Sequence, residues 1–222
     1  MTTTAAEQHL TSAFIGFDEQ DFDVFAIPGL EARMAALIER VRPKLHQLGD
    51  RLAPSLTLLC GEEMYPHVAK HARRTVHPPQ DTWVAYAPNK RGYKAHPHFQ
   101  IGLWQSHLFI QFAVIYESAN KSVFAEHALG RLDEIRSIVP DRYIWSGDHM
   151  NPEATRHGSM TQAELEALFK RLADVKASEV LCGIHLDRSD PLLRDGEALI
   201  SRAEETFETL MPLYRMAFGS MA

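Results

Sequence analysis

The sequence predicts an α+β protein in which helices pack against a mainly antiparallel sheet. Residues 82–87, 99–104 and 107–116 are consecutive segments rich in β-branched and aromatic residues, as expected of a strand meander. On both sides of this meander, apolar residues recur at spacings of three and four, which is typical of helices. With 222 residues, 45% of them hydrophobic, the chain has the size and composition of one globular domain. We therefore expect a single compact domain over residues 13–222 and a flexible extension at residues 1–12.

The first structured segment is expected at residues 22–27, as a short extended piece that ends at Pro28-Gly29. Residues 30–41 predict a helix because five apolar side chains share one face: Leu30, Met34, Leu37, Ile38 and Val41. Pro43 should break or kink this helix, and residues 44–53 should resume it.

Two more elements are expected before the meander. Residues 55–60 are mostly apolar and lie between Pro54 and Gly61, which indicates a strand. Residues 66–74 begin with a proline, which suits the first turn of a short helix.

Within the meander, Gln105-Ser106 is the natural hairpin turn between the second and third strands. Residues 88–97 form a longer, basic loop between the first and second strands. The third strand, residues 107–116, is apolar on both faces, so we expect it at the centre of the sheet.

After the meander, residues 123–139 predict a helix that Pro140 ends. Residues 143–145 predict a short strand that leads into the loop at residues 146–150.

The last third of the chain carries clear helix starts. Thr161 to Glu164 is a capping-box pattern that opens a helix to residue 175, and Asp190-Pro191 opens the last helix, to residue 218. Between them, residues 179–186 predict a strand with His185 on one face and four apolar side chains on the other: Val180, Cys182, Ile184 and Leu186.

The composition excludes several classes of protein. The longest apolar run, residues 108–116, is far shorter than the roughly 20 residues of a membrane helix, and the first residues lack the features of a secretory signal. We therefore expect a cytoplasmic protein with no membrane partner. Cys60 and Cys182 each end an apolar run, which indicates buried, reduced thiols. No phosphate-binding glycine loop, serine nucleophile elbow or dinucleotide fingerprint occurs, so no cofactor is predicted.

Several blocks of the sequence resemble a known family. They are FDVFAIPGLEARM, VRPKL, HVAKHARRTV, PPQDTWVAY, NKRGYK, PHFQIGLW, WSGDHM and LCGIHLDR, and together they cover about residues 17–215. The chain resembles the YktB-like family of uncharacterised proteins from Bacillus-type bacteria. The resemblance implies a compact α+β fold with an antiparallel sheet. It implies no reaction and transfers no site residue, so the functional expectations below come from this sequence alone.

One basic, histidine-rich segment at residues 67–98 contrasts with the rest of the chain. It holds five histidines, six basic residues and one acid, a balance of +5. The remainder holds 17 basic and 28 acidic residues, a balance of −11. Such a contrast indicates local attraction of an anion or a structural need for a basic edge.

His67 and His71 would share a face of the expected helix at residues 66–74 and could clasp a metal ion. However, Val68 stands where the zinc-protease motif has glutamate, and no third ligand follows at a fixed spacing. We therefore predict no metal site, and leave an exposed helix face or anion binding as the two alternatives. Arg73 and Arg74 would either interact with the helix C-terminus or offer a planar fork to a phosphate or carboxylate.

The loop from Asn89 to Lys94 is the stronger candidate for binding. It combines Lys90, Arg91 and Lys94 with Tyr93, and stacking rings beside cations often hold nucleotides or single-stranded nucleic acid. Trp83 is a second stacking candidate. A solvated hairpin loop would have the same composition, and this alternative stays open. His98 flanks the next strand and remains a ligand-binding candidate, although its surroundings lack the hydroxyl of a two-histidine phosphoesterase.

Asp148 and His149 follow Gly147 in a loop, where they would serve either acid–base chemistry or a turn. The leading expectation is therefore a protein that binds a phosphorylated or otherwise anionic ligand, with single-stranded RNA as one such partner. The first alternative is a phosphate-ester hydrolase that uses His67, His71, Asp148 or His149 as acid–base groups. The second is a contact surface for an acidic protein, including a second copy of this chain.

Overall fold

The expected antiparallel sheet is present in the structure, a computed structural model that describes residues 13–219. Its seven strands follow the order β1-β2-β3-β4-β7-β5-β6, and all neighbouring strands run antiparallel. Their bounds are Tyr65–Val68 for β1, Asp81–Ala87 for β2, His98–Trp104 for β3, His107–Val114 for β4, Ile144–Ser146 for β5, Thr155–Arg156 for β6 and Val180–Asp187 for β7. The flexible extension expected at residues 1–12 lies outside the described residues.

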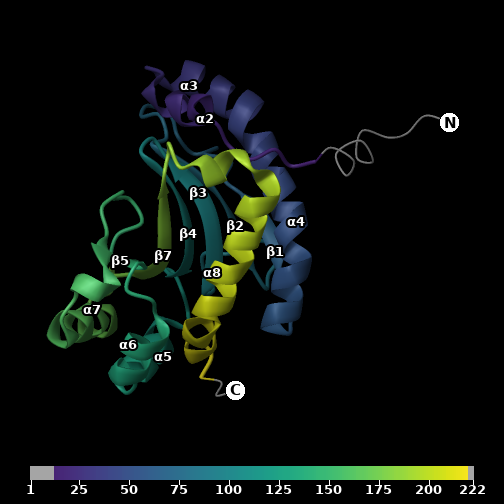
Figure 1. The fold of residues 1–222 in the computed structure, drawn as a ribbon. Helices are drawn as coiled ribbons and strands as arrows, with labels where there is room; N and C mark the ends of the chain where they lie inside the picture. The colour runs from purple at the N-terminus through teal and green to yellow at the C-terminus, as the bar shows by residue number, and fades with distance from the viewer. Residues whose placement is uncertain (1–12, 220–222) are drawn as a thin grey trace.

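Helices cover one face of this sheet and leave the other face to loops (Figure 1). α4 (Arg42–Cys60) packs against β1 and β2, and α8 (Gly196–Met216) packs against β4. The other helices are α2 (Glu19–Asp23), α3 (Leu30–Ala36), α5 (Lys121–Leu129), α6 (Leu132–Ile138) and α7 (Gln162–Asp174), with short helical turns η1 (Val24–Ala26), η2 (Leu37–Val41), η3 (His157–Ser159) and η4 (Pro191–Arg194). None of the helices between residues 13 and 219 combines the length and apolar character that a membrane span requires.

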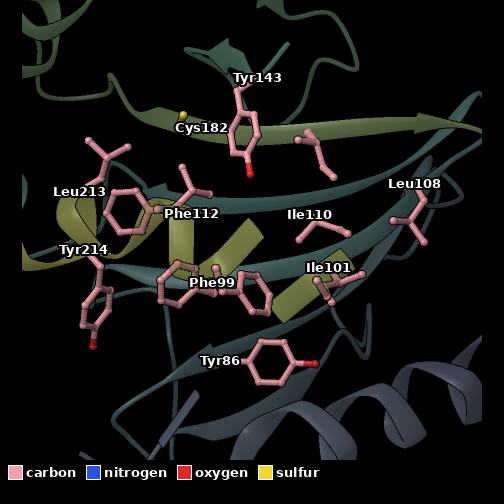
Figure 2. Packing of buried hydrophobic residues seen from close by; sticks show 14 of the residues in the cluster. Tyr86, Phe99, Ile101, Leu108, Ile110, Phe112, Tyr143, Cys182, Leu213 and Tyr214 are labelled. Atoms are coloured by element: carbon pink, nitrogen blue, oxygen red, sulfur yellow. The ribbon is translucent and has the colours of Figure 1, made fainter. Parts of the chain in front are cut away.

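The hydrophobic core lies between the helices and the covered face of the sheet. Strand alternation places Tyr86, Phe99 and Phe112 on this face, where they are fully buried (Figure 2). The ring of Phe99 stacks on Tyr214 of α8 at 5.2 Å and meets Phe207 at 4.9 Å. Complete burial of a side chain of this size contributes about 1.5–3 kcal/mol. The covered face therefore stabilises the fold, and the opposite face can carry polar residues.

Several sequence predictions are confirmed. β2, β3, β4 and β7 lie within two residues of the predicted strands, and β5 overlaps the strand predicted at residues 143–145. β4 is the central strand of the seven and is buried at every position. The capping box at Thr161 and Glu164 opens α7. In β7 the four alternating apolar residues are buried, and His185 lies on the open face with Leu181.

Two of the three predictions near the N-terminus are wrong. Residues 22–27 are mostly helical, in α2 and η1, because Asp18 and Asp21 form a capping box there. The interruption expected at Pro43 is present: α3 ends at Ala36, the π-helical turn η2 follows, and α4 begins at Arg42 with Pro43 in its first turn, where the missing N–H costs nothing. Residues 55–60 are the end of α4 rather than a strand, although Pro54 lies inside the helix. The cause is a fully buried stripe at helical spacing that passes through this proline: Leu45, Leu48, Leu52 and Leu56.

Three later predictions also fail. Residues 66–74 are not a helix, because residues 65–68 pair with β2 as edge strand β1 and His71 has a φ of 52°, outside the right-handed helical region. The helix predicted at residues 123–139 is divided at Gly130 into α5 and α6. Asp190 and Pro191 open only the short turn η4, and a second cap, Asp195, opens α8. The two-residue strand β6 has no counterpart among the predictions.

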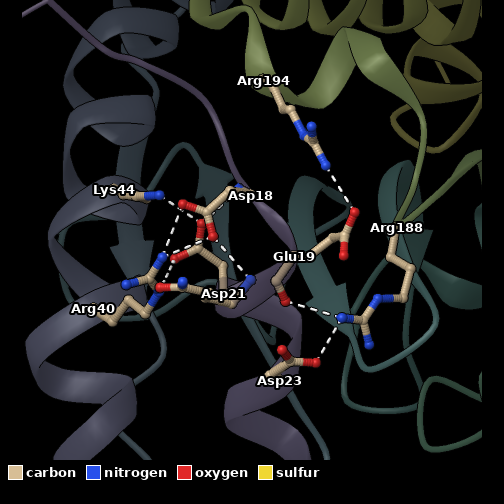
Figure 3. Close-up of polar contacts among 9 residues, drawn as sticks. Asp18, Glu19, Asp21, Asp23, Arg40, Lys44, Arg188 and Arg194 are labelled. Carbon is tan, nitrogen blue, oxygen red and sulfur yellow. Dashed lines mark hydrogen bonds and ion pairs between the residues drawn. The ribbon is translucent and has the colours of Figure 1, made fainter.

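A buried ion-pair cluster fastens the first described helix to the molecule (Figure 3). The carboxylate of Asp21 is fully buried and lies 3.0 Å from Arg40 Nε and 2.5 Å from Lys44 Nζ. Two surface pairs, Asp23 with Arg188 at 2.6 Å and Glu19 with Arg194 at 2.7 Å, join α2 to the segment after β7. Helix α2 is thus connected both to its sequence neighbours and to the far end of the chain.

Candidate functional site

A pocket lies on the open face of the sheet, opposite the hydrophobic core. Its floor comes from the outward-facing side chains of four strands, chiefly Trp83, Gln100, Phe109, Gln111 and His185. Its walls come from the loop at residues 88–97 and the loop after β5, and its free volume is about 50 Å³. A wider groove of about 690 Å³ lies beyond Trp104, which lines both spaces.

The floor contains a chain of hydrogen bonds. Gln111 Nε2 donates to Gln100 Oε1 at 3.1 Å, and Gln100 Nε2 donates to His98 Nε2 at 2.8 Å. Because His98 Nε2 accepts this bond, its Nδ1 carries the proton and donates to the carbonyl of His96 at 2.8 Å. Burial lowers the pKa of His98 to about 4, which agrees with this neutral form. His98, two residues from Gln100 on the same face of β3, therefore ends this chain of hydrogen bonds.

A glycine in the floor makes room for an aromatic ring. A Cβ atom at Gly102 of β3 would lie 2.4 Å from Phe109 Cζ and 2.5 Å from the carbonyl oxygen of Thr82. Real Cβ atoms do not approach other atoms so closely. The ring of Phe109 can therefore lie across β3 only because position 102 has no side chain.

Tyr93 and Lys94 reach the pocket from the loop at residues 88–97. The indole Nε1 of Trp83 donates to the hydroxyl of Tyr93 at 3.0 Å, and the Tyr93 ring meets His98 edge-on at 4.8 Å. Lys94 Nζ pairs with Glu117 at 3.0 Å. The loop is thus fixed to the sheet by an aromatic residue, and its only pocket-lining cation is already neutralised.

His149 and Glu179 form a hydrogen-bonded acid–base pair beside the pocket. Glu179 Oε1 accepts hydrogen bonds from the backbone N–H and from Nδ1 of His149, both at 2.6 Å. The Glu179 side chain is 4% exposed, whereas that of His149 is 24% exposed and lines the pocket. The hydrogen bond to Glu179 raises the pKa of His149 despite partial burial. Because Nδ1 is occupied, Nε2 is the nitrogen that remains for a substrate.

Asp81 at the start of β2 is a second titrating group in the pocket. It is 4% exposed, and burial raises the pKa of its carboxyl group to about 6, although the charges of His149 and Arg74 oppose this. Strongly shifted acids and bases that share a cleft are typical of catalytic sites.

One group of residues in the described part of the chain could hold a metal ion. Ligand atoms of Asp148, His149 and Glu179 all lie within 4.8 Å of one another. Hydrogen bonds already occupy some of them, because Glu179 Oε1 binds His149 and Asp148 Oδ1 accepts from the backbone of Met150 at 2.8 Å. Glu179 Oε2 is buried and has no hydrogen-bond partner between residues 13 and 219.

The structure brings together only part of the predicted binding set. Trp83, Tyr93, Lys94, Asp148 and His149 line the pocket, and His98 is hydrogen-bonded to the pocket residue Gln100. Anion binding by these residues stays a prediction.

The other predicted residues lie outside the pocket. His67 binds the carbonyl of Asn89 through Nε2 at 2.7 Å, and His71 meets Thr82 Oγ1 at 3.2 Å. Arg73, Lys90 and Arg91 are exposed on loops, and Lys90 lies over the ring of Tyr65 at 5.1 Å. Arg74 is half-buried. Residues 67–98 therefore divide between the pocket, its supporting layer and the outer loops.

Sequence reasoning missed five residues of the site. Four lie in strands and face the pocket, and the fifth precedes β7: Asp81, Gln100, Phe109, Gln111 and Glu179. The glutamines gave a signal, because each interrupts an otherwise apolar strand and they face one another across β3 and β4. A polar side chain inside a buried strand needs a hydrogen-bonding partner, so the two glutamines indicate that this face of the sheet carries polar groups.

Comparison with known proteins gives one family match. Residues 17–214 match the family model described as a domain of unknown function, DUF1054. A UPF0637 protein of Bacillus licheniformis is 52% identical over 200 residues, which cover 90% of this chain and 95% of the relative. A UPF0637 protein of Lysinibacillus sphaericus is 49% identical over 205 residues, with 92% and 97% covered. Among solved structures, a conserved hypothetical protein from Pyrococcus furiosus has a TM-score of 0.37 at 14% identity, with 81% of this chain and 95% of that chain covered.

Proposed function

Because this chain belongs to the DUF1054 family, whose members' names specify no reaction, we propose a function from the geometry of its pocket: general acid–base catalysis on a small polar molecule. The observation that carries the proposal is the pair of His149 and Glu179 beside the pocket. A buried carboxylate that orients a partly exposed imidazole is the arrangement that many enzymes use to move a proton.

The proposed chemistry is hydrolysis. His149 Nε2 takes a proton from a water molecule in the pocket, and the water oxygen attacks the substrate. The carboxylate of Glu179 fixes the tautomer and stabilises the imidazolium that forms, since it accepts the Nδ1–H bond at 2.6 Å. The imidazolium then passes this proton from Nε2 to the leaving group, so the same histidine serves first as base and then as acid.

The test is hydrolysis of p-nitrophenyl acetate, p-nitrophenyl phosphate and bis(p-nitrophenyl) phosphate by purified protein. We expect His149→Gln to lower the rate by about a hundredfold or more, because a positioned general base contributes about 10²–10⁴. The rate should rise with pH as His149 loses its proton, and Glu179→Gln should move this rise to lower pH, because it removes the charge that raises the pKa of His149.

His77→Gln is the matched control, because His77 is exposed and lies outside the pocket. Its rate should equal that of the unmodified protein. Equal rates for the protein and its His149→Gln variant, or no turnover of any of the three esters, would contradict the proposal.

A second proposal is that an anionic ligand, a phosphorylated small molecule or single-stranded RNA, binds the outer basic loops. The observation that favours it is that Arg73 and Arg91 are exposed and take part in none of the ion pairs between residues 13 and 219. Exposed guanidinium groups without a carboxylate partner remain available for phosphate.

A further inference from the structure

We propose that the pocket selects a small organic cation, with a guanidinium or primary ammonium head group, as its ligand. This inference names the substrate class of the proposed acid–base site and rests on that proposal for its catalytic meaning. Three independent features of the pocket lead to it: its charge balance, its supply of hydrogen-bond donors and its aromatic lining.

The first feature is an excess of carboxylates. Asp81, Asp148 and Glu153 line the pocket, whereas Lys94 is the only lysine or arginine there. The charge of Lys94 is matched by Glu117 at 3.0 Å, and a proton on His149 is matched by Glu179. None of the three lining carboxylates takes part in an ion pair between residues 13 and 219, although the charges of His149 and Arg74 act on Asp81. The lining therefore favours cations over anions.

Asp81 is the carboxylate that most clearly lacks a cationic partner. Its side chain lies almost entirely out of water, yet it takes part in none of the ion pairs in the described part of the chain, and no other residue there donates a hydrogen bond to it. Burial of an unpaired carboxylate costs free energy that a cationic ligand would offset.

The second feature is that three donors of the pocket are engaged within the protein, while the lining carboxylates supply acceptors. Trp83 Nε1 donates to Tyr93, Lys94 to Glu117, and Gln111 to Gln100. The carboxylates of Asp81, Asp148 and Glu153 offer acceptor oxygens, and a guanidinium, with five N–H donors and no acceptor, complements them.

The third feature is the aromatic lining. Rings of Trp83, Tyr93, Trp104 and Phe109 surround the same space. The face of an aromatic ring is electron-rich and attracts cations, and guanidinium groups also stack on it. Because the pocket holds only about 50 Å³, it fits a head group, and the groove beyond Trp104 offers room for the rest of a longer ligand.

Tryptophan fluorescence gives a direct test, because Trp83 and Trp104 line the pocket whereas Trp145 is buried on the other face. Methylguanidinium is the probe and methylurea, a neutral molecule of the same shape, is its control, at constant ionic strength. We expect saturable quenching by methylguanidinium, with about tenfold or weaker affinity for methylurea. n-Butylammonium should behave like methylguanidinium, and 1-butanol like methylurea.

Asp81→Asn should weaken methylguanidinium binding about tenfold or more, because it removes the most buried carboxylate. Glu126→Gln, an exposed glutamate on α5, is the matched control and should have no effect. Equal affinity for methylurea, unchanged affinity in Asp81→Asn, or no saturation by either cation below about 20 mM would overturn the inference. Quenching only by inorganic phosphate would also overturn it, as would quenching only by Mn²⁺ or Zn²⁺.

The two proposals can fail separately. Cation binding is measured without a substrate, whereas the acid–base proposal is measured by ester hydrolysis. If the protein binds cations but hydrolyses no ester, the ligand class stands and the catalytic proposal is removed. If hydrolysis depends on His149 but no cation binds, the catalytic proposal stands and the ligand class is removed.

Discussion

Asp81 is a residue whose burial destabilises the unliganded protein, and a cationic ligand would offset that cost. A carboxylate that is ionised in water but 4% exposed in the folded protein loses hydration on folding, and its raised pKa of about 6 reflects this loss. The unfolded chain has the ordinary value of 3.8. Between these two pH values the folded state binds more protons than the unfolded state, so the contribution of Asp81 to stability falls as pH rises through this window.

Asp81→Asn should therefore stabilise the protein at neutral pH. The gain in the free energy of unfolding at pH 7.5 should be up to about 3 kcal/mol, from a shift of about two pKa units at 1.36 kcal/mol each. The gain should shrink toward zero below about pH 3, where the aspartic acid is neutral in both states. Urea unfolding at several pH values measures it, and a variant that is less stable at pH 7.5, or a gain that does not depend on pH, would refute the assignment.

At the residue scale, sequence reasoning singled out candidates by their chemical type, and the structure places four of them at one pocket. Tyr93 and Lys94 were singled out as part of a basic loop, and Asp148 and His149 as an adjacent acid–base pair, and all four line the pocket. Glu179 was missed because its role depends on His149, thirty residues away in sequence. Glu179 meets His149 only because the strands bring the two segments together, and no local pattern in the sequence indicates this contact.

At the scale of elements, the meeting of β3 and β4 determines the depth of the pocket. Gly102 faces Phe109 across this strand pair, and Gly183 of β7 similarly lies against Gln111, where a Cβ would come within 2.7 Å of its Cβ atom. Small residues at these two positions allow large side chains of β4 to lie flat on the sheet.

Gly102→Ala should destabilise the protein by about 1–3 kcal/mol, because the added methyl group overlaps Phe109, Thr82 and Trp83. It should also change the fluorescence of Trp83, whose Cβ lies 2.6 Å from the new atom. Thermal unfolding followed by tryptophan emission records both effects. The control is Gly92→Ala, which meets no atom within 4 Å and should change stability by less than about 0.5 kcal/mol. Equal stabilities of the two variants would show that β3 adapts to the extra atom.

Elements were predicted well where periodicity and burial agree. The meander was found because β2, β3 and β4 are short, β-rich and separated by turn residues. The end of α4 was mistaken for a strand because Pro54 usually marks a boundary, yet its buried leucine stripe continues past it. β1 was mistaken for a helix because its four residues carry no alternating pattern, and it is a strand only because β2 offers it a free edge.

At the scale of the whole molecule, charge is distributed unevenly. The segment at residues 67–98 carries +5 against −11 elsewhere, yet the fold turns carboxylates into the pocket and leaves Arg73, Lys90 and Arg91 on outer loops. Ligands of opposite sign would therefore meet different parts of the surface.

The proposal of anion binding on the outer loops predicts a specific salt dependence. Three phosphate contacts on single-stranded RNA should give a slope of log affinity against log salt of about −2. Arg91→Ala should reduce the size of this slope by about 0.7, whereas Lys176→Ala, outside the basic segment, should leave it unchanged. Fluorescence anisotropy of a labelled oligonucleotide measures it. Absence of binding at low salt would eliminate nucleic acid as a ligand of these loops.

The strand order has a consequence for synthesis of the chain on the ribosome. β7 is made after all the other strands, but it lies between β4 and β5 in the sheet. Until residue 187 has emerged, β4 has β3 on one side and an open hydrogen-bonding edge on the other, and this edge belongs to the apolar sequence HLFIQFAV. Unpaired apolar edges of this kind promote aggregation. The nascent chain must therefore protect its most hydrophobic strand until nearly the whole protein has been translated.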